Sequence, residues 1–211
     1  MKKLLMYTLF ILFYISGYSQ NVDKVIQTPI YTSYFSYTTH TPLYVIYKLY
    51  HGGGKVSRSG MEFTTNNFVQ SSTKEDYENS GYDIGHMCNA EDFAFDKNKE
   101  IITFRFYNAL PQTPKLNRGT WKSLELKIRK LSQNDSILVI CGGFNFNRTT
   151  KNGSTCKVPD YCYKIYKDLK TKQVYCYLFP NDNSDTFKTI NEEDLLKQIN
   201  YNTTTIKNST K

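Results

Sequence analysis

The sequence has 211 residues, of which 39% are hydrophobic and 22% are charged. A chain of this length and composition forms one globular domain, or at most two small ones, and is not collagen-like, a coiled coil or disordered throughout. Its 27 Lys and Arg residues against 19 Asp and Glu residues give a net charge of +8, which favours polyanionic partners but does not by itself prove one.

Residues 1–19 are typical of a secretory signal peptide. Lys2 and Lys3 precede a mostly apolar run from Leu4 to Ile15, which is too short for a comfortable membrane span, and small residues stand at a cleavage position before Gln20. We therefore expect an exported protein, secreted or periplasmic, with no membrane attachment after cleavage. The alternative is that this segment stays in place as an uncleaved membrane anchor.

Five cysteines follow the signal, and export would place them in oxidising conditions that allow disulfides. The number is odd, so at least one thiol stays free or pairs between chains, and the sequence does not choose among the pairings of the others. A hairpin predicted below could bring Cys162 close to Cys176. No C-x-x-C pair occurs, which argues against a structural zinc site.

In chain order, the Thr- and Tyr-rich residues 20–40 predict an irregular entry segment, and the polar residues 61–80 predict a loop. Runs of β-branched and aromatic residues bounded by Gly or Pro predict strands. Gly142 and Gly143 are expected to end one of these strands, and a turn near Asp168–Thr171 joins the last two. The runs are Pro42–Tyr50, Ile101–Tyr107, Ser136–Cys141, Tyr161–Tyr166 and Val174–Phe179.

Two segments have the apolar spacing of helices. The first starts at Thr113-Pro114, an N-cap followed by proline, and contains Gly119, which costs about 1 kcal/mol inside a helix. The second runs from Ser184 to Ile199. Their apolar stripes are Trp121, Leu124, Ile128 and Leu131 in the first helix, and Leu195, Leu196 and Ile199 in the second.

Residues 201–211 are predicted to be a flexible C-terminal tail, which leaves residues 20–200 as a single domain. No internal repeat and no long linker divides it. Because strands, a helix, further strands and a second helix follow one another, the predicted class is α+β.

The residues that suggest chemistry gather around one of three histidines. His40 and His51 have no acidic or amide cluster beside them and are interpreted as loop or surface residues. His86 ends a D-x-G-H motif at residues 83–86, and three further motifs follow it: N-x-x-P-Q at 108–112, L-N-R-G at 116–119 and W-x-x-x-E at 121–125. Any one of these motifs is common by chance, whereas the ordered set is highly specific.

This ordered set resembles the DNA/RNA non-specific endonuclease family, the ββα-metal (His-Me finger) nucleases. The motifs span residues 81–125, and weaker similarity extends from about Tyr44 to Phe179. The resemblance implies an α+β, ββα-metal nuclease fold with a mostly antiparallel central sheet flanked by helices. It also implies that DNA and RNA are the substrates.

Position by position, the resemblance implies that His86 is the general base and that Asn117 is the single protein ligand of Mg²⁺, with Mn²⁺ as the alternative metal. Glu125 matches the acid that orients a water of the metal, and Asn108 matches a second amide near the scissile phosphate. Asp83 matches a residue with a structural role. The residue types suit this chemistry, because a neutral imidazole accepts a proton near pH 7 and Mg²⁺ needs few protein ligands.

One position departs from the family pattern. The family usually has Arg at the second position of D-x-G-H, where this sequence has Ile84. Such an arginine would help to neutralise the substrate's charge, which isoleucine cannot do. Arg58, Arg118 and Arg105 are the candidates to bind substrate in its place, and the sequence does not show which of them reaches the site.

We therefore expect an exported Mg²⁺-dependent endonuclease that hydrolyses DNA and RNA with a His-activated water and leaves 5′-phosphate ends. The alternative is a catalytically weakened nucleic-acid-binding protein of the same fold, disabled by Ile84. A third reading, a secreted structural protein with accidental motif matches, is disfavoured by the order of the motifs. The sequence does not indicate an oligomeric state.

Overall fold

The structure is a computed structural model that describes residues 20–211; the predicted signal peptide lies outside the described residues. Seven strands form one antiparallel sheet in the order β1-β2-β3-β6-β9-β10-β11. Two smaller antiparallel pairs join β4 with β5 and β7 with β8. The strands are β1 Lys24–Gln27, β2 Tyr31–Ser36, β3 Thr41–Leu49, β4 Asp83–His86, β5 Ala109–Gln112, β6 Ile137–Phe144, β7 Arg148–Thr149, β8 Lys157–Val158, β9 Tyr161–Asp168, β10 Val174–Pro180 and β11 Lys188–Ile190.

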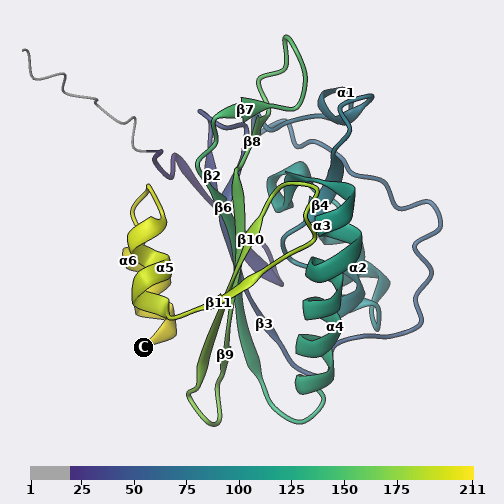
Figure 1. Cartoon of the computed structure of the whole chain (residues 1–211). Coiled ribbons are helices and arrows are strands. Elements are labelled where there is room, and N and C mark those ends of the chain that lie inside the picture. Colours follow the sequence, from purple (N-terminus) through teal and green to yellow (C-terminus); the bar gives the residue numbers. More distant parts are fainter. Residues whose placement is uncertain (1–19) are drawn as a thin grey trace, which may run out of the picture.

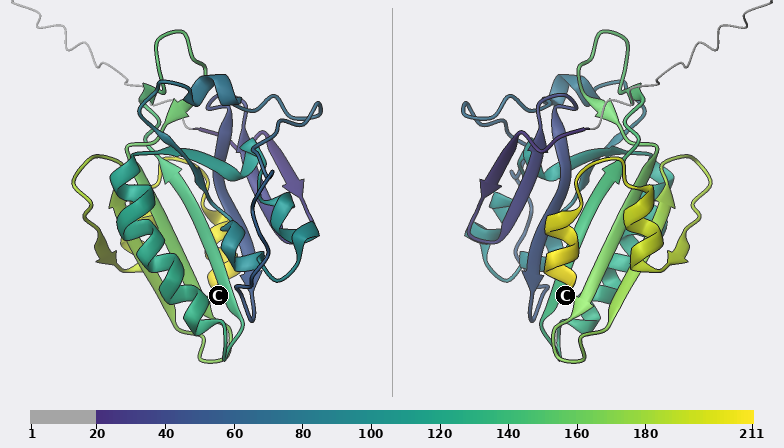
Figure 2. Two further views of the ribbon diagram at one scale, coloured as in Figure 1. Left: turned by 90° about the vertical axis from the view of Figure 1, so that its right-hand side faces the viewer. Right: turned by 90° about the vertical axis from the view of Figure 1, so that its left-hand side faces the viewer.

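Helices cover both faces of the large sheet, as Figures 1 and 2 show. Helix α4 and the shorter α2 and α3 lie on one side, and the C-terminal helices α5 and α6 lie on the other. The helices are α1 Lys74–Tyr77, η1 Ala90–Phe93, α2 Lys97–Ile102, η2 Phe106–Asn108, α3 Pro114–Leu116, η3 Asn117–Trp121, α4 Lys122–Leu131, α5 Glu192–Gln198 and α6 Thr204–Thr210. The predicted α+β class and mostly antiparallel sheet are confirmed. No helix within residues 20–211 is both long enough and apolar enough to cross a membrane.

Strand β6 lies at the centre of the sheet, and all eight of its residues are buried. A strand covered on both faces reads as a continuous apolar run, which is why this strand was recognisable in the sequence. The prediction that Gly142 and Gly143 end it is wrong, because the strand continues to Phe144. A Cβ atom on Gly142 would lie 2.5 Å from the Leu43 carbonyl oxygen and 2.6 Å from the Tyr163 hydroxyl, so only glycine fits at this crossing.

The segment predicted to be an irregular entry, residues 20–40, instead contains β1 and β2. Strand β2 pairs with β3 in a register that sets Thr32 opposite Ile46, and the hydroxyl of Ser33 donates to the Tyr107 carbonyl oxygen at 2.5 Å. The Ser33 hydroxyl is thus satisfied by a partner far away in the sequence. The strand conformation of β2 is therefore not visible as an apolar pattern.

The prediction of a strand at residues 101–107 is also wrong, because α2 and the 3-10 helix η2 occupy this segment. Asp96 caps α2, and its carboxylate accepts hydrogen bonds from the backbone of Asn98 and Lys99. A side-chain cap at a helix start outweighs the β propensity of the following apolar residues. Within the predicted loop at 61–80, residues 74–77 form the short helix α1.

The predicted hairpin around Asp168–Thr171 is confirmed by β9 and β10. Its register sets Cys162 opposite Phe179 and Cys176 opposite Ile165, so the two cysteines are not cross-strand partners. All five cysteines are buried and free, and the suggested proximity of Cys162 to Cys176 is wrong.

The C-terminal region differs from the prediction in two ways. Only residues 192–198 of the predicted helix 184–199 are helical, because Asn191 caps α5 and strand β11 precedes it. The predicted loose tail contains α6, in which Ile206 is fully buried. The hydroxyl of Tyr201 donates to the Leu43 carbonyl oxygen at 3.1 Å, which attaches the end of the chain to the sheet.

Candidate active site

The antiparallel pair β4–β5 carries His86 at the end of β4, where the register sets His86 opposite Ala109. The residue before His86, Gly85, is a glycine for a steric reason. A Cβ atom on Gly85 would lie 2.0 Å from the side-chain oxygen of Gln112, so glycine at this position leaves room for the buried Gln112 side chain. The D-x-G-H motif is thus the strand β4, with the histidine at its end.

The predicted helix from Thr113 is not one straight helix. It consists of α3, the π-helical turn η3 and α4, with a kink at Gly119, whose backbone angles are φ −102° and ψ −110°. A Cβ atom on Gly119 would lie 2.3 Å from Asp185 Oδ1, and this carboxylate accepts the backbone N–H of Thr120 at 2.9 Å. Such π turns are often found at functional sites, and this one begins at Asn117.

A cleft of about 400 Å³ lies between strand β4, turn η3 and helix α4. It brings together His86, Asn117 and Glu125, the three residues with the most specific predicted roles. Arg58 and Arg118 also line it, so five of the seven predicted site residues meet in one place. The remaining lining residues are Ile84, Asn89, Glu91, Lys122, Leu126 and Arg129.

The ring of His86 is half-buried between two aromatic side chains. Its centroid lies 4.5 Å from that of Phe63 and 4.8 Å from that of Phe104. Nε2 is buried without a hydrogen-bond partner, whereas Nδ1 is neither buried in this way nor bonded to any described residue, so Nδ1 is the nitrogen left open to the cleft. Burial, assisted by the positive charge of Arg58, lowers the pKa of His86 to about 3. The ring is therefore neutral near pH 7.

Asn117 is held by Asp83, to which its side-chain N–H donates at 2.9 Å. A carboxylate only accepts hydrogen bonds, so this contact assigns Nδ2 to the Asp83 side and leaves Oδ1 without a hydrogen bond among the described residues. Arg118 donates to both oxygens of Asp83, at 2.8 and 2.6 Å. Burial alone raises the pKa of Asp83, but the hydrogen bonds from Arg118 and Asn117 outweigh it and hold this pKa below its usual value.

The donor set fits a hard divalent cation held by few protein ligands. A free amide oxygen is a ligand type that Mg²⁺ accepts, and Mg²⁺ commonly keeps several waters. Within residues 20–211 no cluster of three His, Cys, Asp or Glu side chains is arranged to hold a metal. Asn117 Oδ1 would therefore be the protein's direct ligand, with Glu125 on the same cleft wall.

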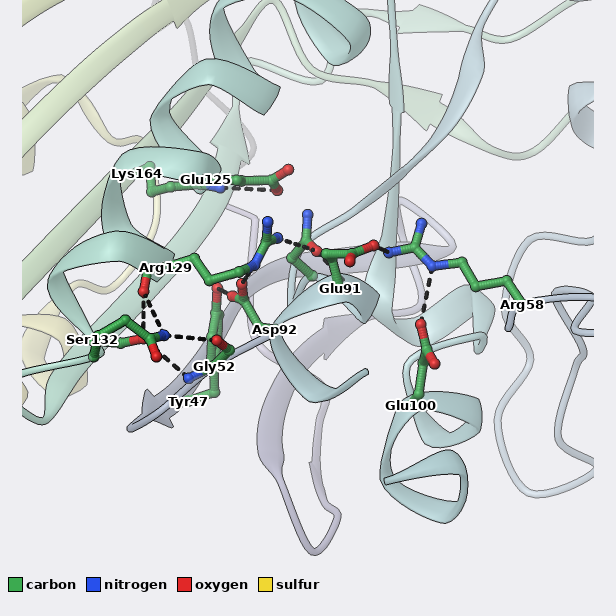
Figure 3. A network of polar contacts seen from close by, with 12 residues as sticks. Tyr47, Gly52, Arg58, Glu91, Asp92, Glu100, Glu125, Arg129, Ser132 and Lys164 are labelled. Atoms are coloured by element: carbon green, nitrogen blue, oxygen red, sulfur yellow. Dashed lines mark hydrogen bonds and ion pairs between the residues drawn. The ribbon is translucent and has the colours of Figure 1, made fainter. Parts of the chain in front are cut away.

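Glu125 is almost completely buried although it lines the cleft. One of its carboxylate oxygens accepts a hydrogen bond from Lys164 Nζ at 3.1 Å, as Figure 3 shows. A buried carboxylate is costly unless it is paired, and this ion pair supplies the partner. The W-x-x-x-E motif thus predicted the acid but not the lysine that accompanies it.

The three arginines of the cleft are paired with carboxylates. Arg58 donates to Glu91 at 2.6 Å and to the fully buried Glu100 at 2.9 Å. Arg129 donates to the buried Asp92 at 2.9 Å, deeper in the same network (Figure 3). Burial raises the pKa of Asp92 to about 6, against the lowering effect of Arg129. Arg129 is not part of any of the four motifs, and only its tertiary contacts reveal its place in the cleft.

Two predicted site residues lie outside the cleft. Asn108 is fully buried, and its side chain is used by the backbone: Oδ1 accepts from Cys88 N at 2.8 Å, and Nδ2 donates to the carbonyls of Cys88 and Thr103 at 2.9 Å. The resemblance implies an amide near the scissile phosphate; the structure places Asn108 outside the cleft, where it supports the chain just after His86. Arg105 donates to Thr64 Oγ1 and lines a separate surface hollow with Glu62 and Ile101, so its predicted substrate contact is not supported either.

Ile84 does line the cleft, so the position where the family has arginine faces the site with an apolar side chain. His40 and His51 do not line the cleft; both have positive φ angles, of 55° and 49°, in turns. This agrees with their interpretation as loop residues.

Comparison with known proteins agrees with this geometry. A family model described as DNA/RNA non-specific endonuclease matches residues 12–210. Mitochondrial endonuclease G of Bos taurus is 31% identical over 123 residues, covering 56% of this chain and 41% of that protein. A nuclease of Nostoc sp. is 35% identical over 89 residues, covering 42% of this chain and 32% of the nuclease. The matches thus span less than half the length of these curated relatives.

The fold also has a solved counterpart. The crystal structure of the EndoG/EndoGI complex contains a chain that superposes with a TM-score of 0.69 at 24% identity, with 82% of each chain covered. This similarity concerns the fold, a ββα-metal nuclease fold with a mostly antiparallel sheet. From the family model over residues 12–210 and the site built on its motifs, the chain belongs to the DNA/RNA non-specific endonuclease family.

Proposed function

We propose that this chain is an exported, Mg²⁺-dependent endonuclease that hydrolyses phosphodiester bonds of DNA and RNA and leaves 5′-phosphate ends. The observation that carries the proposal is the convergence of His86, Asn117 and Glu125 on one cleft. Membership of the family supports the substrate class. The signal-like residues 1–19 support export to a secreted or periplasmic location.

His86 acts as the general base in this proposal. Its Nδ1 is open to the cleft and its ring is neutral near pH 7, because burial keeps the pKa far below the usual 6.5. Nδ1 takes a proton from a water, and the resulting hydroxide attacks phosphorus in line with the leaving 3′ oxygen. General-base assistance of this kind contributes about 10²–10⁴-fold to a rate.

In this proposal Asn117 provides a ligand for the metal ion, and Glu125 binds a water molecule in the cleft. Asn117 offers Oδ1 as a metal ligand, with Mn²⁺ as an alternative to Mg²⁺, and the free carboxylate oxygen of Glu125 accepts a hydrogen bond from a water in the cleft. A bound divalent cation supplies charge neutralisation for the phosphate and stabilises the leaving oxygen. The neutral Asn ligand leaves the charge of that cation available to the phosphate.

Arg58, Arg118 and Lys122 line the cleft and hold the phosphates on either side of the cut. Contacts of this kind carry no base information, so cleavage has little sequence selectivity. Because phosphate contacts release counterions, affinity falls steeply with salt.

A plasmid-nicking assay on the chain lacking residues 1–19 tests the proposal. Nicking that requires Mg²⁺ and stops in EDTA is the expected result, and end-labelling of the products should identify 5′-phosphates. Secretion of the full-length chain with loss of residues 1–19 tests the export part. A purified protein that binds neither DNA nor RNA, and cleaves neither at any Mg²⁺ concentration, would overturn the function.

One observation favours a second candidate, a nucleic-acid-binding protein with weakened catalysis. Ile84 contributes no charge to the cleft, and Arg58 and Arg118 are each paired with carboxylates of the protein itself. Less positive charge then remains to stabilise the reacting phosphate. In the nicking assay this candidate would bind DNA with ordinary salt dependence and leave it uncut with Mg²⁺ or Mn²⁺.

A further inference from the structure

We propose that Lys164 is a positioning residue for Glu125, holding one carboxylate oxygen from behind so that the other one faces the cleft. This inference rests on the proposed nuclease function and deepens it, because it names a residue outside the cleft on which the acid depends. The carrying observation is the ion pair between Lys164 Nζ and Glu125 Oε1 at 3.1 Å.

Lys164 has an unusual position for a lysine. It lies in β9, opposite Cys141 of β6 and Tyr177 of β10, and its side chain is 0% exposed. Lysine is almost never fully buried without a partner. The ammonium cannot reach solvent from the middle of the sheet, so its side chain is directed to the underside of α4, where Glu125 meets it.

Trp121 fixes the ammonium from another side. Lys164 Nζ lies 3.9 Å from the centroid of the Trp121 ring, a cation–π contact. Trp121 is the last residue of the η3 turn that begins at Asn117. The lysine therefore contacts both the acid of α4 and the turn that carries the metal-ligand candidate, which couples the geometry of these two residues.

The hydrogen-bond pattern divides the two oxygens of Glu125. Oε1 accepts the hydrogen bond from Lys164, and Figure 3 shows the second oxygen pointing away from the lysine. No hydrogen bond from a described residue occupies that second oxygen. A carboxylate held at one oxygen has one orientation instead of several, which is the way outer partners of a metal site act on the groups they support.

The charges around the pair support the same role. Asp92 and Arg129 form a second buried ion pair, in which Arg129 Nε donates to Asp92 at 2.9 Å. That arginine is thus engaged with its own carboxylate, and Lys164 is the cation bonded to Glu125. Burial alone lowers the pKa of Lys164, but Cys141, Glu125 and Asp92 raise it above its ordinary value, so the lysine stays charged.

The test compares Lys164→Met with Lys167→Met in the nicking assay. Lys167 is a nearly buried lysine of the same strand that makes no ion pair with any described residue, so it is the matched control. We expect K164M to lower kcat about 10- to 100-fold with KM for DNA within threefold, the size typical of an outer partner of a metal site. K167M should keep kcat within threefold. Equal loss of kcat in both variants, or none in K164M, would overturn the inference.

A second measurement does not depend on cleavage. The unfolding equilibria of wild type, K164M, E125Q and the double variant E125Q/K164M form a double-mutant cycle. We expect K164M to be the least stable, because it leaves a buried carboxylate unpaired, and E125Q/K164M to regain stability. If K164M does not fold, the cleavage rates of E125Q and E125Q/K164M are compared instead, and the two rates should be equal. A further tenfold loss in the double variant, or additive stabilities, would contradict a role through Glu125.

The two proposals fail in different ways. A wild-type protein that binds nucleic acid but never cleaves it overturns the nuclease function and this inference with it, whatever the stability cycle shows. A wild-type protein that cleaves, with K164M as fast as K167M, overturns the role of Lys164 alone.

Discussion

The side-chain amide of Asn117 donates to Asp83 at 2.9 Å, and this contact decides which atom Asn117 presents to the cleft. Asp83 begins β4 and Asn117 begins the π turn, so the D-x-G-H and L-N-R-G motifs meet through a hydrogen bond between residues 34 positions apart. Because the carboxylate accepts only, the amide oxygen is left for a cation. The first residue of the D-x-G-H motif thus orients the proposed metal ligand.

This relationship predicts the effect of Asp83→Leu. Without its acceptor, Asn117 loses its fixed orientation, and the Mg²⁺ concentration for half-maximal nicking should rise about 10- to 100-fold. Titration of Mg²⁺ in the nicking assay measures this. Because Arg118 also loses its partner, Arg118→Met serves as the control and should leave the Mg²⁺ requirement within threefold. An unchanged Mg²⁺ requirement in D83L would contradict the orienting role.

Replacing His86 should abolish cleavage and leave the fold intact. The ring of His86 makes no hydrogen bond with any described residue, so His86→Ala removes the base without breaking a structural polar contact, and we expect a loss of about 10²–10⁴-fold in kcat. Circular dichroism monitors the fold. His51→Asn is the control, since this exposed residue lies in a turn with φ 49° that asparagine tolerates. Near-normal cleavage by well-folded H86A would remove His86 from its role.

The lowered pKa of His86 predicts an unusual pH profile. The base works when neutral, and with a pKa of about 3 instead of 6.5 it stays neutral well into the acid range. Loss of cleavage on acidification should therefore occur below pH 6. Replacing the packed ring by Phe63→Ala admits water to the imidazole, raises its pKa and should move the acid limb upward. A wild-type limb centred at pH 6.5 would show that the ring is not desolvated.

The same shift links pH to stability, with a definite sign. The folded state disfavours the imidazolium, so between pH 6.5 and about 3 the unfolded chain binds more protons at this residue than the folded one. The free energy of unfolding should therefore fall as the pH is lowered through this window. Denaturant unfolding of wild type and H86A measures it, and the pH slope should be smaller in H86A. Parallel slopes would exclude a contribution from His86.

The apolar residue in the cleft predicts the outcome of Ile84→Arg. An added positive charge in the wall of the cleft should raise nicking activity or leave it unchanged, because it offers a further partner for the phosphate. The neutral control is Ile84→Leu, which should match wild type. Steady-state rates with plasmid substrate provide the comparison. A large loss in I84R alone would mean that the site has adapted its geometry to isoleucine.

Arg58 and Arg105 differ in position, and this difference predicts different effects on DNA binding. Arg58 lines the cleft and Arg105 lies outside it, so Arg58→Met should weaken DNA binding and reduce the slope of log K against log salt by about one, whereas Arg105→Met should change neither. Filter binding in EDTA over a range of salt measures this without cleavage. R58M also leaves the buried Glu100 unpaired, so its stability is measured alongside. The same slope in both variants would contradict a phosphate contact by Arg58.

Local sequence patterns predicted much of the fold. The apolar run of β6 and the aromatic and β-branched residues of β9 and β10 were readable because buried strands have a characteristic composition. The strands β1 and β2 were not, because β1 is only four residues long and the polar side chains of β2 find partners outside the sheet: the Tyr31 hydroxyl donates to the Ile102 carbonyl oxygen and the Ser33 hydroxyl donates to the Tyr107 carbonyl oxygen. The helices α2 and α6 were missed for other reasons: the cap at Asp96 outweighs the β propensity of the residues that follow it, and the burial of Ile206 is visible only in the folded chain.

By itself the sequence determined the family motifs, and through them the identity of His86, Asn117 and Glu125, because these residues stand at characteristic spacings along 40 positions of chain. Only the tertiary structure decided that Asn108 is a buried support, that Arg105 lies elsewhere, and that Lys164 pairs with Glu125 across 39 residues. The physical reason is that a residue's role at a site depends on its burial and on its partner, and partners far apart along the chain leave no periodic trace in the sequence.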